Sequence, residues 1–341
     1  MNSTSAVVVG LDVGGTKTNA TMLAEDGAFL VDQMVAVPSR VNEGPPAAVA
    51  AINEAMARAL AVTGIPVAAV LAVGLDTPGP ASADGVIAAR GATNFSGTEW
   101  HRFDLRRAVE EHLHLPVIYN NDGNAAALYA HQQRFGPDAF RRSSIAAIVG
   151  TGLGGGVIEA GRVVRGACGM AGELGHVYIP MDGLLVDDQP VPRCNCGFVG
   201  DLESVASLSA IAKNLLPFWL TRYPDHPLAR LEVGGAALLV REFAERGDEM
   251  ALRIFEQQAM AIGRMFTIAA NFTDPDAYLV GGGITDTTAE FRDWLLDRIR
   301  TATRLREEQA DVAIFAVVPD LDMAGARGSA LAALHAVRPE R

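Results

Sequence analysis

The sequence has little positive charge and no long apolar run, and each shortage excludes a class of protein. It carries 28 Lys and Arg against 40 Asp and Glu, a net charge of −12. A nucleic-acid surface needs clustered cations that neutralise phosphates, so such a surface is not expected. No apolar run reaches the roughly 18 residues of a membrane span. The first residues lack basic side chains before a short apolar run at 6–9. We therefore expect no signal peptide and a cytoplasmic protein.

Cysteine is also scarce. The chain has three cysteines, and two of them, Cys194 and Cys196, are separated by one residue. An odd number with this spacing argues against a disulfide framework and fits a reducing compartment. The remaining composition, 49% hydrophobic and 20% charged residues, is ordinary for a globular protein, and 341 residues allow two domains.

One stretch, residues 172–203, concentrates chemically active side chains. It contains Gly-Glu-Leu-Gly-His at 172–176, Cys-Asn-Cys-Gly at 194–197 and Gly-Asp-Leu-Glu at 200–203. Histidine, cysteine and carboxylates are the usual ligands of zinc. The stretch therefore predicts a metal site beside a polar pocket.

The first glycine-rich turn, Asp12-Val-Gly-Gly-Thr-Lys17, lies between two strand-like apolar runs. This arrangement predicts a β-hairpin, and two interpretations of it stay open. One is a tight turn that needs positive φ. The other is a phosphate cradle, in which Gly15 lets a phosphate approach the backbone while Asp12, Thr16 and Lys17 supply polar groups.

Two loops after predicted strands are candidate ligand sites. Gly79 belongs to Asp76-Thr-Pro-Gly-Pro80, a rigid loop at the carboxyl end of a strand, where ligands bind in open α/β sheets. Asn94 lies in Thr93-Asn-Phe95. Its side chain is suited equally to a polyol ligand and to a hydrogen bond with its own backbone.

The segment Asn120-Asn-Asp-Gly-Asn124 joins a short strand to a helix that runs to about Arg134. Asp122 occupies the position of an N-cap, a role that stabilises a helix by about 1 kcal/mol. Three Asn around one Asp exceed what a cap needs. We therefore favour a general base at this strand-to-helix corner.

The second glycine-rich turn, Gly150-Thr-Gly-Leu-Gly-Gly-Gly156, matches the pattern of a dinucleotide site. That interpretation requires a following helix, whereas residues 157–164 predict two short strands around a turn. The turn instead repeats the plan of the first one: strand, glycine-rich hairpin, strand. Two similar α/β halves with facing hairpins describe a nucleotide in an interdomain cleft.

A third set of glycines, Gly281-Gly-Gly283, ends the last predicted buried strand, at 277–280. Gly282 would then flank an adenine or ribose. Three glycines are equally a plain turn signal. The region between residue 203 and this strand shows apolar residues at helical spacing.

In this order, the motifs resemble those of the ROK family (repressors, open reading frames and sugar kinases) of the actin–hexokinase-like superfamily. The resemblance covers almost the whole chain. The matching segments are Asp12–Lys17 and Gly150–Gly156 for the two phosphate motifs, Asn121-Asp122 for the catalytic pair, Gly172–His176 for the sugar signature, Cys194–Glu203 for the zinc knuckle and its trailing Glu, and Gly281–Gly283 for the nucleotide-side glycines.

The resemblance implies an α/β, two-domain actin/hexokinase-like (ribonuclease H-like) fold with an interdomain cleft. It implies ATP-dependent transfer of the γ-phosphate to a hexose hydroxyl, first of all the 6-OH of glucose, with Asp122 as general base, Mg²⁺ accompanying ATP and a homodimer. The implied sugar-binding residues are Gly79, Asn94, Asn121, Glu173, His176 and Glu203. The implied ATP- and phosphate-binding residues are Asp12, Gly15, Thr16, Lys17, Thr151, Gly152, Gly154 and Gly282.

The family's zinc is held by one His and three Cys, and the matching positions here are His176, Cys194, Cys196 and Asp201. An aspartate thus replaces the third cysteine. A carboxylate can ligate zinc, in a harder and weaker site than three thiolates give. We expect a structural zinc that orients His176, with loss of the metal as the alternative. Cys168, outside the knuckle, is a weaker candidate ligand.

Other functions stay open. An N-acetylhexosamine kinase (N-acetylmannosamine or N-acetylglucosamine) shares all these motifs, with residues 93–100 lining the deciding pocket, and polyphosphate is a second possible donor. A catalytically silent sugar sensor is the alternative outside enzymes, although Lys17 and Asp122 argue against it. The family's repressors carry a helix-turn-helix domain before the first phosphate hairpin. That hairpin starts within ten residues of Met1 here, so we expect no such domain.

For domain organisation, we expect a small α/β domain of residues 1–121 completed by 324–341. Residues 122–323 would form the large α/β domain, which carries the sugar-binding and zinc-knuckle segment.

Overall fold

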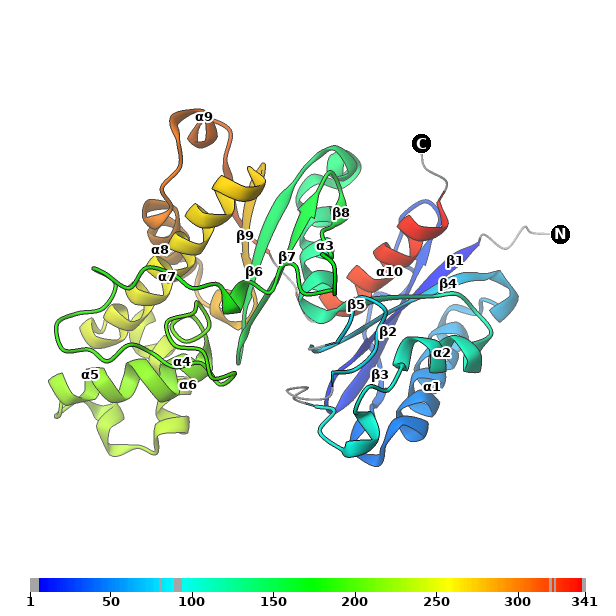
Figure 1. Ribbon diagram of the computed structural model, residues 1–341, viewed down its shortest axis with the longest axis horizontal. Coiled ribbons are helices and arrows are strands. Elements are labelled where there is room, and N and C mark those ends of the chain that lie inside the picture. Colours follow the sequence, from blue (N-terminus) through cyan, green and yellow to red (C-terminus); the bar gives the residue numbers. More distant parts are fainter. Residues whose placement is uncertain (1–5, 80, 89–93, 319–320, 322, 339–341) are drawn as a thin grey trace. The chain divides into compact units, whose positions relative to one another are not determined.

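The computed structural model describes residues 6–79, 81–88, 94–318, 321 and 323–338. Pro80 and Thr93, named above in the two candidate ligand loops, lie outside these residues. The chain forms two compact units (Figure 1). Unit 1 comprises Met1–Gly136, Arg162–Gly172 and Asp320–Arg341, and unit 2 comprises Pro137–Gly161 and Glu173–Pro319.

Unit 1 is built on a five-stranded sheet of order β3-β2-β1-β4-β5. The first two strands form an antiparallel hairpin, and β4 and β5 run parallel to β1. The strands are β1 (Val7–Val13), β2 (Lys17–Ala24), β3 (Val35–Pro38), β4 (Val70–Thr77) and β5 (Val117–Asn121). The helices are α1 (Pro45–Thr63), α2 (Leu105–Leu113), α3 (Asp122–Phe135) and α10 (Ala324–Val337).

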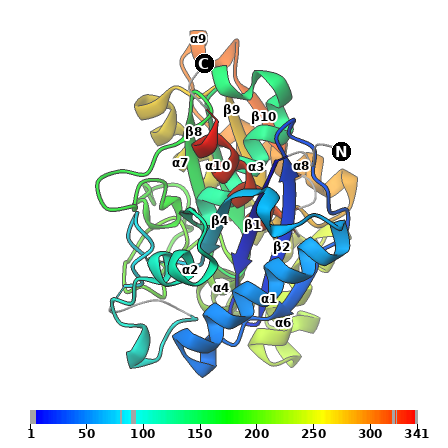
Figure 2. The same cartoon turned by 90° about the vertical axis from the view of Figure 1, so that its right-hand side faces the viewer.

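The two faces of this sheet are covered by different helices. Helix α1 lies over one face of the sheet (Figure 2). Odd-numbered β1 residues such as Val9 and Leu11 join a buried cluster with Ile52 of α1. The other face has glycine where α10 approaches. A Cβ at Gly10 would lie 1.9 Å from the Ala326 carbonyl oxygen. Only a residue without a side chain allows so close a contact.

Helix α3 packs against α10. A Cβ at Gly328 of α10 would lie 1.8 Å from the carbonyl oxygen of Ala125 in α3. The expected boundary after residue 121 separated α3 from β5, whereas this packing groups α3, through Gly136, with unit 1. Residues 162–172 also join unit 1, where Arg165 donates to the Asn120 side chain at 3.2 Å.

The second sheet has the order β10-β9-β6-β7-β8. Strand β7 pairs antiparallel with β6, whereas β9 is parallel to both β6 and β10. The strands are β6 (Ser144–Val149), β7 (Leu153–Glu159), β8 (Arg162–Val163), β9 (Ala277–Gly281) and β10 (Ile314–Val317). Two strands thus follow the second glycine-rich turn, as predicted, so this turn does not open the helix that a dinucleotide site requires.

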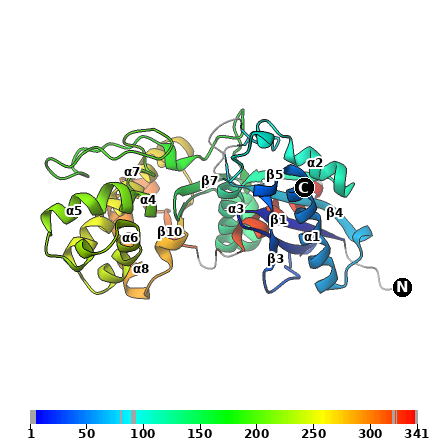
Figure 3. The same ribbon diagram turned by 90° about the horizontal axis from the view of Figure 1, so that it is seen from below.

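The helices of unit 2 (Figure 3) are α4 (Leu208–Ala210), α5 (Leu216–Arg222), α6 (Val233–Glu245), α7 (Glu249–Thr273), α8 (Ala289–Ala302) and α9 (Glu307–Ala310). Helix α7 is buried along much of its length and contacts α5, α6 and α8. A π-helix, Ile211–Leu215, joins α4 to α5. None of the helices in the described residues is long and apolar enough to cross a membrane.

Candidate active site

In unit 1, the carboxyl ends of three parallel strands carry polar side chains. The register places Asp76 of β4 opposite Asp12 of β1 and opposite Asn120 of β5. Asp12 Oδ2 accepts a hydrogen bond from Asn19 Nδ2 at 2.9 Å. Parallel pairing therefore gathers, at one edge of the sheet, residues that lie far apart in the sequence.

The first glycine-rich turn is the β1–β2 hairpin, as predicted. Gly14 N–H donates to the Lys17 carbonyl oxygen at 2.9 Å and closes the turn, while Thr16 and Lys17 are exposed. A Cβ at Gly15 would lie 2.6 Å from Asn94 Oδ1. The structure thus places Asn94, whose role the sequence left open, against this hairpin.

Asp122 is the first residue of α3 and is exposed, but it is not the N-cap. The cap is Asn121, whose Oδ1 accepts from Asn124 N–H at 2.7 Å. The capping role that the sequence suggested for Asp122 is therefore wrong by one residue. Asp122 Oδ1 accepts from Gly123 N–H at 2.7 Å, which fixes the carboxylate at the start of the helix.

In unit 2, the second glycine-rich turn lies next to the glycines that follow β9. Gly150 N–H donates to the Gly152 carbonyl oxygen at 2.8 Å. Gly282 has φ +86, and a Cβ there would lie 2.4 Å from the carbonyl oxygen of Val149, at the start of this turn. The structure therefore brings Gly282 to the turn that carries Thr151, and Gly154, in the second half of this turn, belongs to β7.

The sugar signature packs beside the same turn. Residues Leu174–His176 form a 3₁₀ helix that follows Glu173. A Cβ at Gly175 would lie 2.4 Å from the Leu153 carbonyl oxygen, and Glu203 N–H donates to the Gly175 carbonyl oxygen at 2.8 Å. Two segments predicted to bind sugar, at Glu173 and Glu203, are thus hydrogen-bonded neighbours.

Glu203 makes two contacts that its sequence position did not reveal. Its Oε2 accepts from Leu153 N–H of the second turn at 2.8 Å. Its Oε1 lies 3.2 Å from Cys194 Sγ. One carboxylate therefore links the phosphate-type turn to the cysteine cluster.

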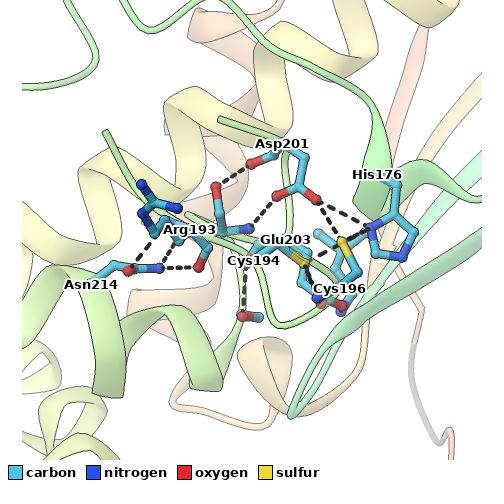
Figure 4. A network of polar contacts seen from close by, with 10 residues as sticks. His176, Arg193, Cys194, Cys196, Asp201, Glu203 and Asn214 are labelled. Atoms are coloured by element: carbon cyan, nitrogen blue, oxygen red, sulfur yellow. Dashed lines mark hydrogen bonds and ion pairs between the residues drawn. The ribbon is translucent and has the colours of Figure 1, made fainter. Parts of the chain in front are cut away.

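The predicted metal ligands converge (Figure 4): one ligand atom from each of His176, Cys194, Cys196 and Asp201 lies within 4.8 Å of the others. His176 Nδ1 is 3.2 Å from Asp201 Oδ2, 3.6 Å from Cys196 Sγ and 4.0 Å from Cys194 Sγ. A tetrahedral zinc with its usual bond lengths separates its ligand atoms by roughly 3.3–3.8 Å. The four side chains therefore fit a tetrahedral zinc with little movement.

The replacement residue Asp201 is anchored for this position. It is fully buried, and its second oxygen, Oδ1, accepts from Ser204 N–H at 3.0 Å. Burial raises the pKa of Asp201, but hydrogen bonds from His176 and Ser204 N–H outweigh it and leave the pKa lowered. The hydrogen bond to Asp201 likewise raises the pKa of His176. Asp201 is thus held as a carboxylate beside the His176 ring.

Two further residues bear on the metal-ligand cluster: Cys168, a weaker candidate ligand from the sequence, and Asn214, which the sequence did not single out. Cys168 is exposed, belongs to unit 1 and is not part of the cluster found in the described residues. Asn214, on the π-helix, holds the knuckle by donating to the carbonyl oxygens of Arg193 at 3.0 Å and Ser204 at 2.8 Å (Figure 4). Nothing in the sequence near Asn214 signals this role, because the contact is made only through the fold.

Comparison with models of protein families identifies the family of this chain. The model of the ROK family matches residues 8–336. The chain belongs to the ROK family. As a ROK protein, it has the actin/hexokinase-like α/β fold that the motifs predicted.

Individual ROK proteins resemble the chain along most of its length. The glucokinase of Halalkalibacterium halodurans is 31% identical over 281 residues, which is 81% of this chain and 80% of the relative. The N-acetyl-D-glucosamine kinase of Citrobacter koseri is 30% identical, with 82% and 85% covered. The crystal structure of a ROK family glucokinase from Streptomyces griseus, in complex with glucose and AMPPNP, superposes with a TM-score of 0.69 at 30% identity, with 97% of this chain and 100% of that chain covered.

Proposed function

We propose that the chain is an ATP-dependent sugar kinase that transfers the γ-phosphate of ATP to a hexose hydroxyl, with glucose as the first candidate. The glucokinase relative and the glucokinase structure with glucose and AMPPNP support this substrate pair. The observation that carries the catalytic part is Asp122. It is an exposed carboxylate at the carboxyl end of β5, and the helix cap is supplied by its neighbour Asn121.

Asp122 would accept the proton of the sugar hydroxyl as that oxygen attacks the γ-phosphorus. The new O–P bond forms as the bond between phosphorus and the bridging oxygen of ADP breaks, and ADP leaves with the electron pair. General-base assistance typically contributes 10²–10⁴-fold. Positioning and charge stabilisation would supply the remainder.

The two hairpins would bind the phosphates of ATP, which arrives with Mg²⁺ as its partner. Their backbone N–H groups and the exposed Lys17 suit anionic oxygens. Sugar hydroxyls need paired donors and acceptors, since a site built to bind a hydroxyl strongly rejects an analogue that lacks it. The residues assigned to this role are Gly79, Asn94, Asn121, Glu173, His176 and Glu203.

A structural zinc would be held by His176 Nδ1, the two thiolates and Asp201 Oδ2. Its contribution would be to fix the ring of His176, so that Nε2 faces the sugar. Metal analysis of protein purified without chelator tests this. About one zinc per chain is expected, and less than roughly a tenth would contradict it.

The deciding experiment is an ADP-release assay with glucose, N-acetylglucosamine, N-acetylmannosamine and no sugar. Fastest turnover with glucose supports the first candidate, and fastest turnover with an N-acetylhexosamine supports the second, which the C. koseri relative favours. Sugar binding without ADP release would indicate a sensor. Replacing ATP by polyphosphate in a parallel assay identifies the donor.

The Asp122→Asn variant tests the base. It should lower kcat by about 10²-fold or more, because Asn retains the hydrogen bond to Gly123 N–H but cannot accept the proton. Asp293→Asn, at an exposed position on α8, is the matched control and should leave kcat unchanged. If Asp122→Asn kept kcat within a few-fold of wild type, Asp122 would not be the base.

A further inference from the structure

Asp76 is a buried carboxyl that the mechanism above does not use. It has no solvent-exposed surface, and its Oδ2 accepts from Ser329 Oγ of α10 at 2.7 Å. Its Oδ1 is also buried and meets no donor among the described residues when Asp76 is ionised. The charged groups that act on it, Asp12 of β1 and Asp122 of α3, are both acidic, and its register partner on β5 is the neutral Asn120. An ionised Asp76 would therefore be a buried charge without a cation, which is costly.

Asp12 is the immediate neighbour of this carboxyl. The two residues are register partners on parallel β1 and β4, so their side chains leave the same face of the sheet one strand spacing apart, about 4.8 Å. Both lie on the face that α10 covers, where a Cβ at Gly74 would lie 1.8 Å from the Ser329 carbonyl oxygen. Helix and sheet thus cover Asp76 completely and Asp12 in part. Two carboxyls in such contact do not both ionise, and one retains a proton.

The surroundings decide which acid keeps the charge. Asp12 accepts from Asn19 and lies at the first turn of α10, where a Cβ at Gly325 would be 2.9 Å from Asp12 Cγ. A helix N-terminus favours negative charge, and this effect fades after the first turn. Asp76 meets α10 only later, at Ser329. Burial first, and then the charge of Asp12, raise the pKa of Asp76 well above its usual value, more than the Ser329 hydrogen bond lowers it.

We propose that Asp76 is a neutral carboxylic acid that donates its Oδ1 proton to Asp12 and fixes the Asp12 carboxylate in place. Ser329 orients Asp76. Asp76 on β4 and Asn19 on β2 then hold the Asp12 carboxylate from two sides, so no cation is needed to neutralise Asp76. Asp76 is thus a positioning residue for Asp12. The protonation of Asp76 does not depend on the proposed kinase function. The expected effect of Asp76 on the KM for ATP, through Asp12, does rest on that function.

The protonation test compares thermal unfolding of the metal-free, ligand-free protein with that of Asp76→Asn from about pH 5 to about pH 9, above the unfolded carboxyl pKa of about 4. Because the folded pKa of Asp76 is raised, folding takes up a proton, and wild-type stability falls as pH rises toward that pKa. The amide that Asp76→Asn introduces cannot ionise, yet it can donate to Asp12 and accept from Ser329. We expect the melting temperature of Asp76→Asn, relative to wild type, to increase with pH.

The control for this comparison is Asp293→Asn. Its melting temperature should change with pH in parallel with that of wild type. A difference between Asp76→Asn and wild type that stays constant or shrinks as pH rises would overturn the proposal. If Asp76→Asn does not fold, the infrared spectrum of wild type decides. A band from a protonated carboxyl at neutral pH that shifts in Ser329→Ala is expected, and its absence would equally overturn the proposal.

The positioning role is tested by the steady-state kinetics of Asp76→Ala and Asp76→Asn. A hydrogen bond to a charged group shifts an equilibrium by about tenfold or more. Asp76→Ala would leave Asp12, which is assigned to the ATP site, without this bond, so it should raise the KM for ATP by about tenfold more than Asp76→Asn does. The KM for sugar should not change. Equal KM values for ATP in the two variants would overturn the positioning role. If wild type releases no ADP with any sugar, the kinase function fails while the protonation test still stands.

Discussion

At the scale of single residues, the candidate site of unit 2 is a set of side chains that each serve two neighbours. Glu203 contacts both the second glycine-rich turn and Cys194, and Asp201 contacts both His176 and Ser204 N–H. A carboxylate anchored by a backbone N–H loses little further freedom when it binds a metal. The anchoring of Asp201 would therefore suit it to ligate a metal at the position where the resemblance implied a cysteine.

The first prediction concerns this replacement. Asp201→Cys restores a third thiolate, a softer ligand that suits zinc, so it should bind zinc at least about tenfold more tightly than wild type. Asp201→Asn, which cannot supply an anionic ligand, should bind more weakly than wild type. Competition with a chromophoric chelator measures all three affinities. Equal affinity of wild type and Asp201→Asn would show that Asp201 is not a ligand.

At the scale of elements, close approach of α10 to the first sheet organises unit 1. Gly10 and Gly74 on the strands let the helix backbone reach the sheet, and Gly328 lets it reach α3. This packing brings the Ser329 hydroxyl within hydrogen-bond distance of Asp76 and places the first turn of α10 next to Asp12. The edge of the sheet that carries the candidate site is therefore shaped by a helix from the far end of the sequence.

A glycine substitution tests that contact. Gly74→Ala would put a Cβ 1.8 Å from the Ser329 carbonyl oxygen, so α10 must move, and we expect a loss of about 3 kcal/mol or more in the free energy of unfolding. Gly235→Ala is the matched control, because a Cβ on that helical glycine meets nothing within 4 Å. The control should stabilise by about 0.5–1 kcal/mol. Urea unfolding measures both, and equal effects would contradict the packing described.

A second prediction at this scale concerns the join between β6 and β9. Asp276 Oδ2 accepts from Ser143 N–H at 2.8 Å, and Oδ1 pairs with Arg142 at 2.7 Å. Burial raises the pKa of Asp276, but these partners outweigh it and leave the pKa lowered. The resulting stability is present above the unfolded pKa of about 4 and is lost as pH falls through the lower folded pKa.

Asp276→Asn should therefore destabilise the protein at neutral pH by about 1 kcal/mol, since the pair is partly exposed. The difference from wild type should shrink as pH falls below about 4. Thermal unfolding in buffers of decreasing pH measures it. A difference that widens with acidity would contradict the assigned pKa direction.

At the scale of the whole molecule, the residues assigned to the proposed reaction are divided between the two units. The proposed base and the first glycine-rich hairpin belong to unit 1, whereas residues 173–176 and the second glycine-rich hairpin belong to unit 2. Ligands that bind only the folded protein stabilise it by RT ln(1 + L/Kd), where L is the free ligand concentration, so the gain grows with the logarithm of ligand concentration relative to Kd. Stability with and without ligand therefore reports binding apart from catalysis.

The corresponding prediction uses glucose at about 100 times its Kd, which should stabilise wild type by about 2.7 kcal/mol. Asp122→Asn should show a similar gain, since the substitution removes the proton acceptor and keeps a polar side chain. Galactose at the same concentration is the control and should have a smaller effect. No gain with glucose or with either N-acetylhexosamine would argue against a sugar site. Light scattering would test the predicted homodimer in the same samples.

The sequence by itself determined the chemistry-bearing segments. Glycine runs, the Asn-Asp pair and the His/Cys/Asp spacing are local signals, and the structure has both hairpins and the four-residue cluster where they were predicted. Tertiary structure decided which neighbours these residues have. Local spacing could not tell that Asn121 caps α3 in place of Asp122, because the boundary of a helix shifts by a residue with its packing.

Nor could the sequence pair Asp12 with Asp76, or Glu203 with Leu153 N–H. Each pair is distant in the chain and is joined by strand register or by a loop folding back onto a hairpin. Residues 162–172 likewise belong to unit 1, where Arg165 contacts Asn120, a residue distant in the chain. A sequence specifies which side chains are available, whereas the protonation of a carboxyl depends on burial and on the charges that the fold brings beside it.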